Sequence, residues 1–115
     1  MNYPQDQIEE LKRCCTGVSV CGEGAYDYFL LEGLSLPEGC SPSSCDALLC
    51  PTQHSGYQAR LFFSVPIQGR FPRNWNGNAR ILERNWYAFS WQVQNTNIRL
   101  IDLVIELLSG FTRQQ

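Results

Sequence analysis

Six cysteines are the side chains best suited to nucleophilic or metal chemistry, and all of them lie in the first half of the chain. A thiolate attacks acyl carbons well and also leaves well, so acyl transfer is the reaction class that it suggests. Cys50 is the last of them, but it ends a leucine-rich run before Pro51, which favours a buried, inert thiol. The others are Cys14, Cys15, Cys21, Cys40 and Cys45.

Three of these cysteines, with the only histidine, offer an alternative role in binding zinc. Cys40, Cys45 and Cys50 recur with four intervening residues, and His54 follows them. Structural zinc sites usually contain closer cysteine pairs, and Cys45 and Cys50 would point to opposite faces if they flank a strand. Without a secretion signal we expect reduced thiols, and we predict no metal and no other cofactor. A small zinc-stabilised interaction module is the alternative.

Ser90 is a second candidate nucleophile, since a serine can form an oxyester where a cysteine would form a thioester. It lies between Phe89 and Trp91, a setting that equally suits a small residue in a packed aromatic segment. It also lacks an adjacent histidine to act as its base. His54 stands before Ser55-Gly56 in a predicted turn, and a single histidine does not assemble a hydrolase triad.

Arginines give the second half of the chain a basic segment, although the net charge of the whole is −2. Arginine and tryptophan are frequent interface anchors, and Trp75 stands between asparagines in a polar stretch. We therefore predict a docking face for an acidic protein partner. The acidic overall balance and the lack of a binding motif argue against nucleic acid. The arginines of the segment are Arg60, Arg70, Arg73, Arg80 and Arg84.

The first half of the chain reads as one helix followed by four strands. Residues 6–15 predict a helix with Asp6 as its cap and Glu9 completing a capping box. Runs of aliphatic and aromatic residues between turn signals then predict strands over 18–21, 26–36, 46–50 and 57–65.

The second half begins irregularly and ends in a helix. Residues 68–78 predict a loop rich in Gly, Pro, Asn and Arg, and residues 79–91 have no assignable period. Two apolar stripes over 98–109 predict a largely buried helix, with Asn95-Thr96-Asn97 as its cap. The length of 115 residues suits one α+β domain, 1–115, with helices on a sheet face. The polar N-terminus and the absence of a long apolar run predict a cytoplasmic protein without a membrane segment.

This order of elements resembles the ubiquitin-conjugating (UBC) enzyme fold. There a helix precedes a four-stranded antiparallel meander, and a long irregular segment with the catalytic cysteine leads to a helix. The segment 72–82 (PRNWNGNARIL), with Trp86 after it, is similar to that active-site segment. Phe71 stands at the position of the family's signature histidine, and the cysteine position falls near Arg80. Asn74 lies near the signature asparagine, which implies a role in stabilising the oxyanion.

A closer resemblance is to the bacterial relatives grouped as prokaryotic UBC-like family E. Those short proteins are typically encoded beside a ubiquitin-like protein, its activating enzyme and a metalloprotease. Where that family continues its last motif with Arg-His, this chain has Trp91-Gln92. The matching pieces are 33–39 (GLSLPEG), 46–51 (DALLCP) and 83–90 (ERNWYAFS).

The resemblance implies a UBC-like component of a bacterial ubiquitin-like conjugation pathway, with that modifier and its activating enzyme as partners. Because no cysteine occupies the catalytic position, both an atypical transferase and a non-catalytic adaptor are open interpretations. The candidate catalytic residues are Ser90, Cys50 and Asn74. The candidate partner-binding residues are Arg70, Arg73, Trp75, Asn76, Asn78, Arg80 and Arg84.

Overall fold

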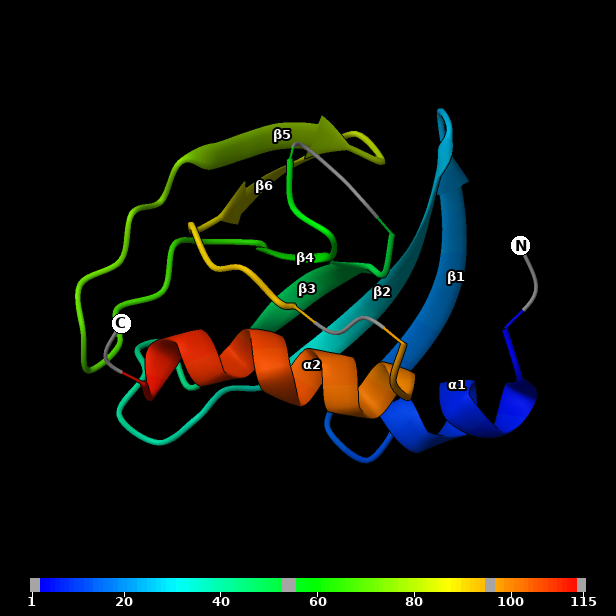
Figure 1. Ribbon diagram of the computed structural model, residues 1–115, viewed down its shortest axis with the longest axis horizontal. Helices are drawn as coiled ribbons and strands as arrows, with labels where there is room; N and C mark the ends of the chain where they lie inside the picture. Colours follow the sequence, from blue (N-terminus) through cyan, green and yellow to red (C-terminus); the bar gives the residue numbers. More distant parts are fainter. Residues whose placement is uncertain (1–2, 53–55, 95–96, 114–115) are drawn as a thin grey trace.

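A curled antiparallel sheet with helices on one face forms the centre of the fold (Figure 1). The computed structural model describes residues 3–52, 56–94 and 97–113, and over these the sheet has six strands in the order β1-β2-β3-β4-β6-β5. The predicted α+β class is confirmed. The strands are β1 (Gly17–Glu23), β2 (Tyr26–Ser35), β3 (Ser44–Cys50), β4 (Arg60–Phe63), β5 (Gly77–Ile81) and β6 (Arg84–Ala88).

The first four strands form the predicted meander, but the prediction of a four-stranded sheet is wrong. The segment that had no assignable period folds into the hairpin β5–β6, which adds to the sheet beside β4. Its apolar residues alternate in strand fashion, since Trp86 and Ala88 are buried while Tyr87 between them is partly exposed. The two-residue turn at Leu82-Glu83 lacks glycine, which removed the usual signal for a hairpin.

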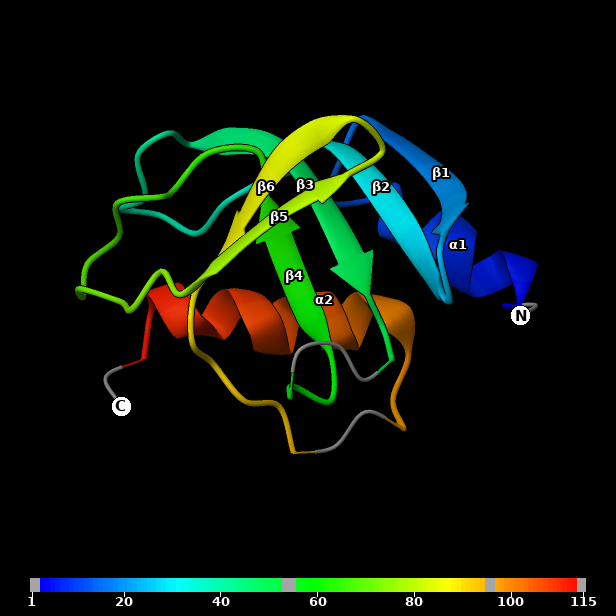
Figure 2. The same ribbon diagram turned by 90° about the horizontal axis from the view of Figure 1, so that it is seen from above.

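Two helices cover the same face of the sheet. Helix α2 (Leu100–Leu108) crosses the sheet, and α1 (Gln5–Leu11) lies beside its N-terminal end (Figure 2). A short 3₁₀ turn, Ser109–Phe111, extends α2. Of the two predicted stripes of α2, the one containing Leu100, Val104 and Leu107 is buried, whereas Ile105 is 58% exposed.

The helix caps differ from those predicted. Pro4 stands at the N-cap of α1, and Asp6 instead binds Arg99 through a 2.7 Å ion pair. The backbone N–H of Leu100, at the start of α2, donates to the side chain of Gln7. A residue of α1 therefore caps α2, which no local pattern reveals. Residues 95–96 of the predicted cap lie outside the described residues.

The central strands β2, β3 and β4 are apolar on both sides because each face of the sheet is covered. Alternate residues such as Phe29, Leu49 and Phe63 pack against the helices in one cluster. Their neighbours pack in a second cluster on the opposite face, which the curled hairpin covers. That second cluster comprises Tyr28, Leu48, Cys50, Phe62, Ile81, Trp86 and Ala88.

Candidate functional site

A polar cluster forms where the beginnings of β4 and β5 meet the end of β6. We call Tyr57, Arg60, Asn76 and Ser90 the Ser90 cluster. The Tyr57 hydroxyl donates to Ser90 Oγ at 3.0 Å, and Asn76 Nδ2 donates to the same Tyr57 oxygen at 2.9 Å. The Arg60 guanidinium donates in turn to Asn76 Oδ1. Residues distant in sequence are thereby linked in one chain of hydrogen bonds.

The hairpin register explains how Asn76 and Ser90 come together. Gly77 pairs with Ala88 at the open end of the β5–β6 hairpin. The residue before Gly77 and the residues after Ala88 therefore lie next to one another where the two strands end. The carbonyl of Asn74 then accepts the backbone N–H groups of Ser90 and Asn76, at 2.8 and 2.9 Å. The predicted loop is therefore held against the segment that carries Ser90.

Arg60 is a buried cation, with only 5% of its surface exposed. Its guanidinium lies 4.1 Å from the centroid of the Tyr57 ring and 5.7 Å from that of Phe62. Within the described parts of the chain it forms no ion pair with a carboxylate, and its buried Nε has no hydrogen-bond partner. Gly77 makes room for it, because a Cβ there would lie 2.8 Å from an Arg60 nitrogen.

The Ser90 cluster makes the Tyr57 phenol easier to ionise than an ordinary tyrosine. Its hydrogen bonds to Ser90 and Asn76, with the nearby charge of Arg60, lower the pKa of the Tyr57 phenol below its ordinary value. Burial acts in the opposite direction but is the weaker influence. A phenolate here would be an acceptor for the Ser90 hydroxyl, which is the arrangement of a nucleophile beside its base.

Sequence reasoning singled out Ser90 and Asn76 but missed Tyr57. It counted Arg60 with the arginines of an exposed docking face, and the 5% exposure of Arg60 corrects that interpretation. Tyr57 and Ser90 are 33 residues apart, and no spacing rule connects a tyrosine before one strand with a serine after another. No histidine stands next to Ser90 in the sequence, so the sequence indicated no base for it. His54, the only histidine, lies outside the described residues.

Cys50 is poorly placed for the catalytic role considered for it. It is fully buried in the cluster below the hairpin, and its Sγ lies 3.5 Å from the Thr52 carbonyl. Burial raises the pKa of its thiol, which lowers the thiolate fraction. Burial also raises the pKa of Cys15, to about 11. The expectation that Cys50 is a buried thiol is confirmed.

The cysteines considered for zinc do not assemble in the described part of the chain. Cys45 packs with the helix-side cluster, whereas Cys50 belongs to the cluster on the other face of β3. Among the residues that the structure describes, there is no group of three or more cysteine, histidine, aspartate or glutamate side chains positioned to hold a metal ion.

Two of the predicted partner-binding residues have structural contacts. Arg73 donates to the carbonyls of Gly110 and Arg113, which ties the loop to the end of the chain's last helical turn. Trp75 is partly buried and packs against Phe63, with ring centroids 5.8 Å apart. Trp75 therefore packs in part against the core, and its role in partner binding stays a prediction.

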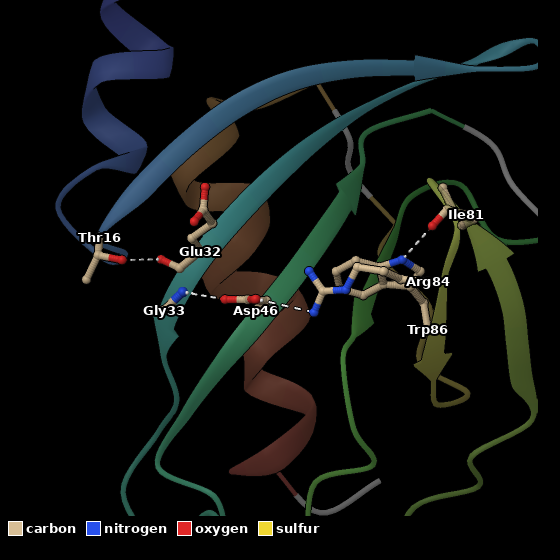
Figure 3. A network of polar contacts seen from close by, with 7 residues as sticks. All are labelled: Thr16, Glu32, Gly33, Asp46, Ile81, Arg84 and Trp86. Carbon is tan, nitrogen blue, oxygen red and sulfur yellow. Dashed lines mark hydrogen bonds and ion pairs between the residues drawn. The ribbon is translucent and has the colours of Figure 1, made fainter.

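The other arginines among the predicted partner-binding residues are more exposed. Arg84 lies over the ring of Trp86 and forms a 3.3 Å ion pair with Asp46, as Figure 3 shows. Arg80 projects from β5 and donates to Asn85 across the hairpin at 3.3 Å. Arg70 and Asn78 are also exposed. Asn78 and Arg80 lie on the edge strand β5 and Arg84 lies on β6, whereas Arg70 lies beside Gly39.

Comparisons with protein-family models, with curated proteins and with solved structures found no match. None of the described helices is long and apolar enough to cross a membrane.

Proposed function

We propose that this chain is a UBC-like component of a bacterial ubiquitin-like conjugation pathway, in which the segment 70–84 binds the activating enzyme and the modifier. The observation that carries the proposal is the position of the segment resembling the family's active site. Its residue Asn76 lies in the same hydrogen-bonded cluster as Ser90. Two of the pieces that supported the resemblance, 72–82 and 83–90, thus contribute residues to one polar site.

The order of elements gives further support. A helix precedes a four-stranded meander, a long segment follows, and a helix packs across the sheet face. The additional hairpin is the main departure, because it turns part of the expected irregular segment into two strands. At the expected cysteine position, Arg80 lies on an exposed strand edge, and a guanidinium cannot form a thioester. Any covalent step must use another residue.

The first experiment measures binding. The purified chain is titrated with a bacterial ubiquitin-like protein and with the matching activating enzyme from the same organism, each by calorimetry at physiological salt. We expect saturable binding to at least one of them. The double reversal Arg70→Glu with Arg80→Glu should weaken it about tenfold or more, because like-charge contacts at an interface are strongly unfavourable. The matched control is Arg113→Glu, an exposed arginine outside the segment.

The second experiment tests group transfer. The chain is incubated with both partners and ATP, and its intact mass is measured, with Lys12→Arg excluding an amide on the sole lysine. An adduct that resists thiols but yields to hydroxylamine indicates an oxyester. Binding without any adduct assigns the adaptor function within the same pathway. Absence of both binding and adduct overturns the proposal.

A further inference from the structure

We infer that Ser90 is the acyl-accepting nucleophile of this protein and that Tyr57 is its general base, in a site organised by Asn76 and Arg60. The inference deepens the proposed function and rests on it for the natural acyl donor, the C-terminal thioester of a ubiquitin-like protein. It goes beyond the family resemblance, which connects neither Tyr57 nor Arg60 with any reaction.

The geometry of the pair is the first support. A general base must lie within hydrogen-bond reach of the proton that it removes, and Tyr57 Oη lies 3.0 Å from Ser90 Oγ. When the phenol is protonated it donates to Ser90. When it is ionised, the direction reverses and the Ser90 hydroxyl becomes the donor. In the ionised state, the hydrogen bond between Ser90 Oγ and Tyr57 Oη therefore points the serine proton at the phenolate oxygen.

Asn76 influences the direction of the hydrogen bond between Tyr57 and Ser90. Its amide oxygen accepts from the guanidinium of Arg60, so its amide nitrogen faces Tyr57 and donates to the phenol oxygen at 2.9 Å. An amide held in this way always presents a donor to Tyr57, which stabilises a phenolate oxygen more than a phenol oxygen. Asn76 acts through Tyr57 and is a positioning residue.

Arg60 supplies a positive charge beside the partly exposed Tyr57. An arginine with 5% exposure normally has a carboxylate partner, because burying an unpaired charge is unfavourable. Within the described residues no ion pair to Arg60 is found, and its Nε is unpartnered. The group that faces it is the Tyr57 ring, 4.1 Å away. Ionisation of Tyr57 would provide the missing counter-charge.

Among the residues that the structure describes, the other groups that face Tyr57 are neutral. Its described polar contacts are Ser90 and Asn76, and Arg60 is the one charged group that influences its ionisation there. The lowered pKa of the Tyr57 phenol is the expected consequence of these contacts.

The reaction balances without a cofactor. The Tyr57 phenolate takes the Ser90 hydroxyl proton as Oγ bonds to the thioester carbonyl carbon. The tetrahedral intermediate collapses, the carbon–sulfur bond breaks, and the departing thiolate of the activating enzyme takes the proton from Tyr57. The products are an oxyester on Ser90 and a free thiol, and the phenolate is restored. Asn74, which holds the Ser90 backbone, is exposed beside the site.

A fluorophosphonate probe tests the nucleophile directly, because it modifies activated serines and does not depend on the natural partners. The intact protein is treated over a pH series, and the modified peptide is identified by mass spectrometry. We expect modification of Ser90, loss of labelling in Ser90→Ala and unchanged labelling in Ser41→Ala, whose serine is also exposed to solvent. Labelling that survives Ser90→Ala overturns the inference.

The variant Tyr57→Phe tests the base. It removes the hydroxyl but keeps a ring over Arg60, and circular dichroism verifies that the fold is retained. We expect Ser90 labelling to slow about 100-fold or more and to lose its rise with pH. Because the hydrogen bonds with Ser90 and Asn76 and the charge of Arg60 lower the pKa of the Tyr57 phenol, the midpoint of that rise should lie below the ordinary tyrosine value. Arg60→Met should move the midpoint to higher pH. A purely structural Tyr57 would change neither the rate nor the profile.

His54 provides the decisive alternative base, since it precedes Tyr57 by three residues. If His54→Gln abolishes the pH-dependent labelling while Tyr57→Phe leaves it intact, the assignment of Tyr57 is wrong. The two proposals fail separately. Labelled Ser90 without partner binding overturns the conjugation function alone. Partner binding with an adduct that persists in Ser90→Ala overturns the Ser90 site alone.

Discussion

The meander β1–β4 and the hairpin β5–β6 belong to one sheet but are held in different ways. Every residue of β1 has a register partner in β2, and β2, β3 and β4 pair over several residues. In the described structure, Phe63 and Tyr87 form the one register pair that joins β4 to β6. The hairpin is fixed mainly by side chains, among them Trp86 in the second core cluster.

The turns of the two regions differ in whether glycine occupies the positions with positive φ. Gly24 occupies the positive-φ position in the β1–β2 turn, where glycine is unstrained. The β5–β6 turn places Leu82 and Glu83 at φ values of 54° and 64°, which disfavours both side chains. The meander thus follows local preferences. The hairpin is held against such preferences by the packing around it, and it adjoins the candidate site.

Removing Trp86 should produce the largest difference between the two regions. Trp86→Ala empties a fully buried position and removes the 2.9 Å hydrogen bond from its Nε1 to the Ile81 carbonyl. We expect the free energy of unfolding to fall by about 3–5 kcal/mol. Amide hydrogen exchange should increase more in β5 and β6 than in β2 and β3. Equal increases throughout would show that the hairpin and meander unfold as one unit.

Gly77→Ala should have the next largest effect. The new Cβ would meet the Arg60 guanidinium at 2.8 Å and the Ala88 Cβ at 3.2 Å, so the Ser90 cluster must shift. We expect a loss of about 1–3 kcal/mol in chemical denaturation, the usual cost of overpacking. Gly22→Ala is the control in the meander, because its nearest contact would be an ordinary 3.5 Å. Equal losses for the two variants would contradict the close approach of Arg60.

Exchanging glycine in the two turns should give smaller effects of opposite sign. Glu83→Gly relieves a left-handed residue and should raise the free energy of unfolding by up to about 1 kcal/mol, although glycine also loses more backbone entropy. Gly24→Ala imposes the same conformation on a side chain and should lower it by about 1 kcal/mol. Thermal unfolding of both variants checks the signs. Destabilisation by Glu83→Gly would show that the glutamate makes a compensating interaction.

Arg84→Gln should have the smallest effect. Its ion pair to Asp46 links the hairpin to β3, but both side chains are more than one third exposed. We expect a loss of about 0.5–1 kcal/mol that shrinks at high salt. Arg99→Gln, which affects the ion pairs between α1 and α2, is the control. Only Arg84→Gln should accelerate amide exchange in β6. If Arg99→Gln accelerates it instead, the helices and not the Arg84–Asp46 ion pair hold the hairpin in place.

The sequence predicted the meander and the last helix because local signals agree there. Glycine and proline separate the strands, and the two-sided apolar runs near 26–36 and 46–50 suit buried strands. It did not predict the hairpin, because a turn of Leu82-Glu83 has no recognised chemistry. It also misplaced both helix caps, since the side chain that caps α2 comes from α1.

For the candidate site, the sequence identified Ser90 as a candidate nucleophile within an aromatic segment. It also indicated that Arg80 stands where a cysteine was expected. The tertiary structure decided that Cys50 is buried and that Ser90 lies against Tyr57. It also decided that Arg60 is a buried cation beside them. The physical reason is that composition and hydrophobic periodicity depend only on residues close together in the sequence. Burial, charge pairing and the approach of a base depend on contacts made by segments far apart in sequence.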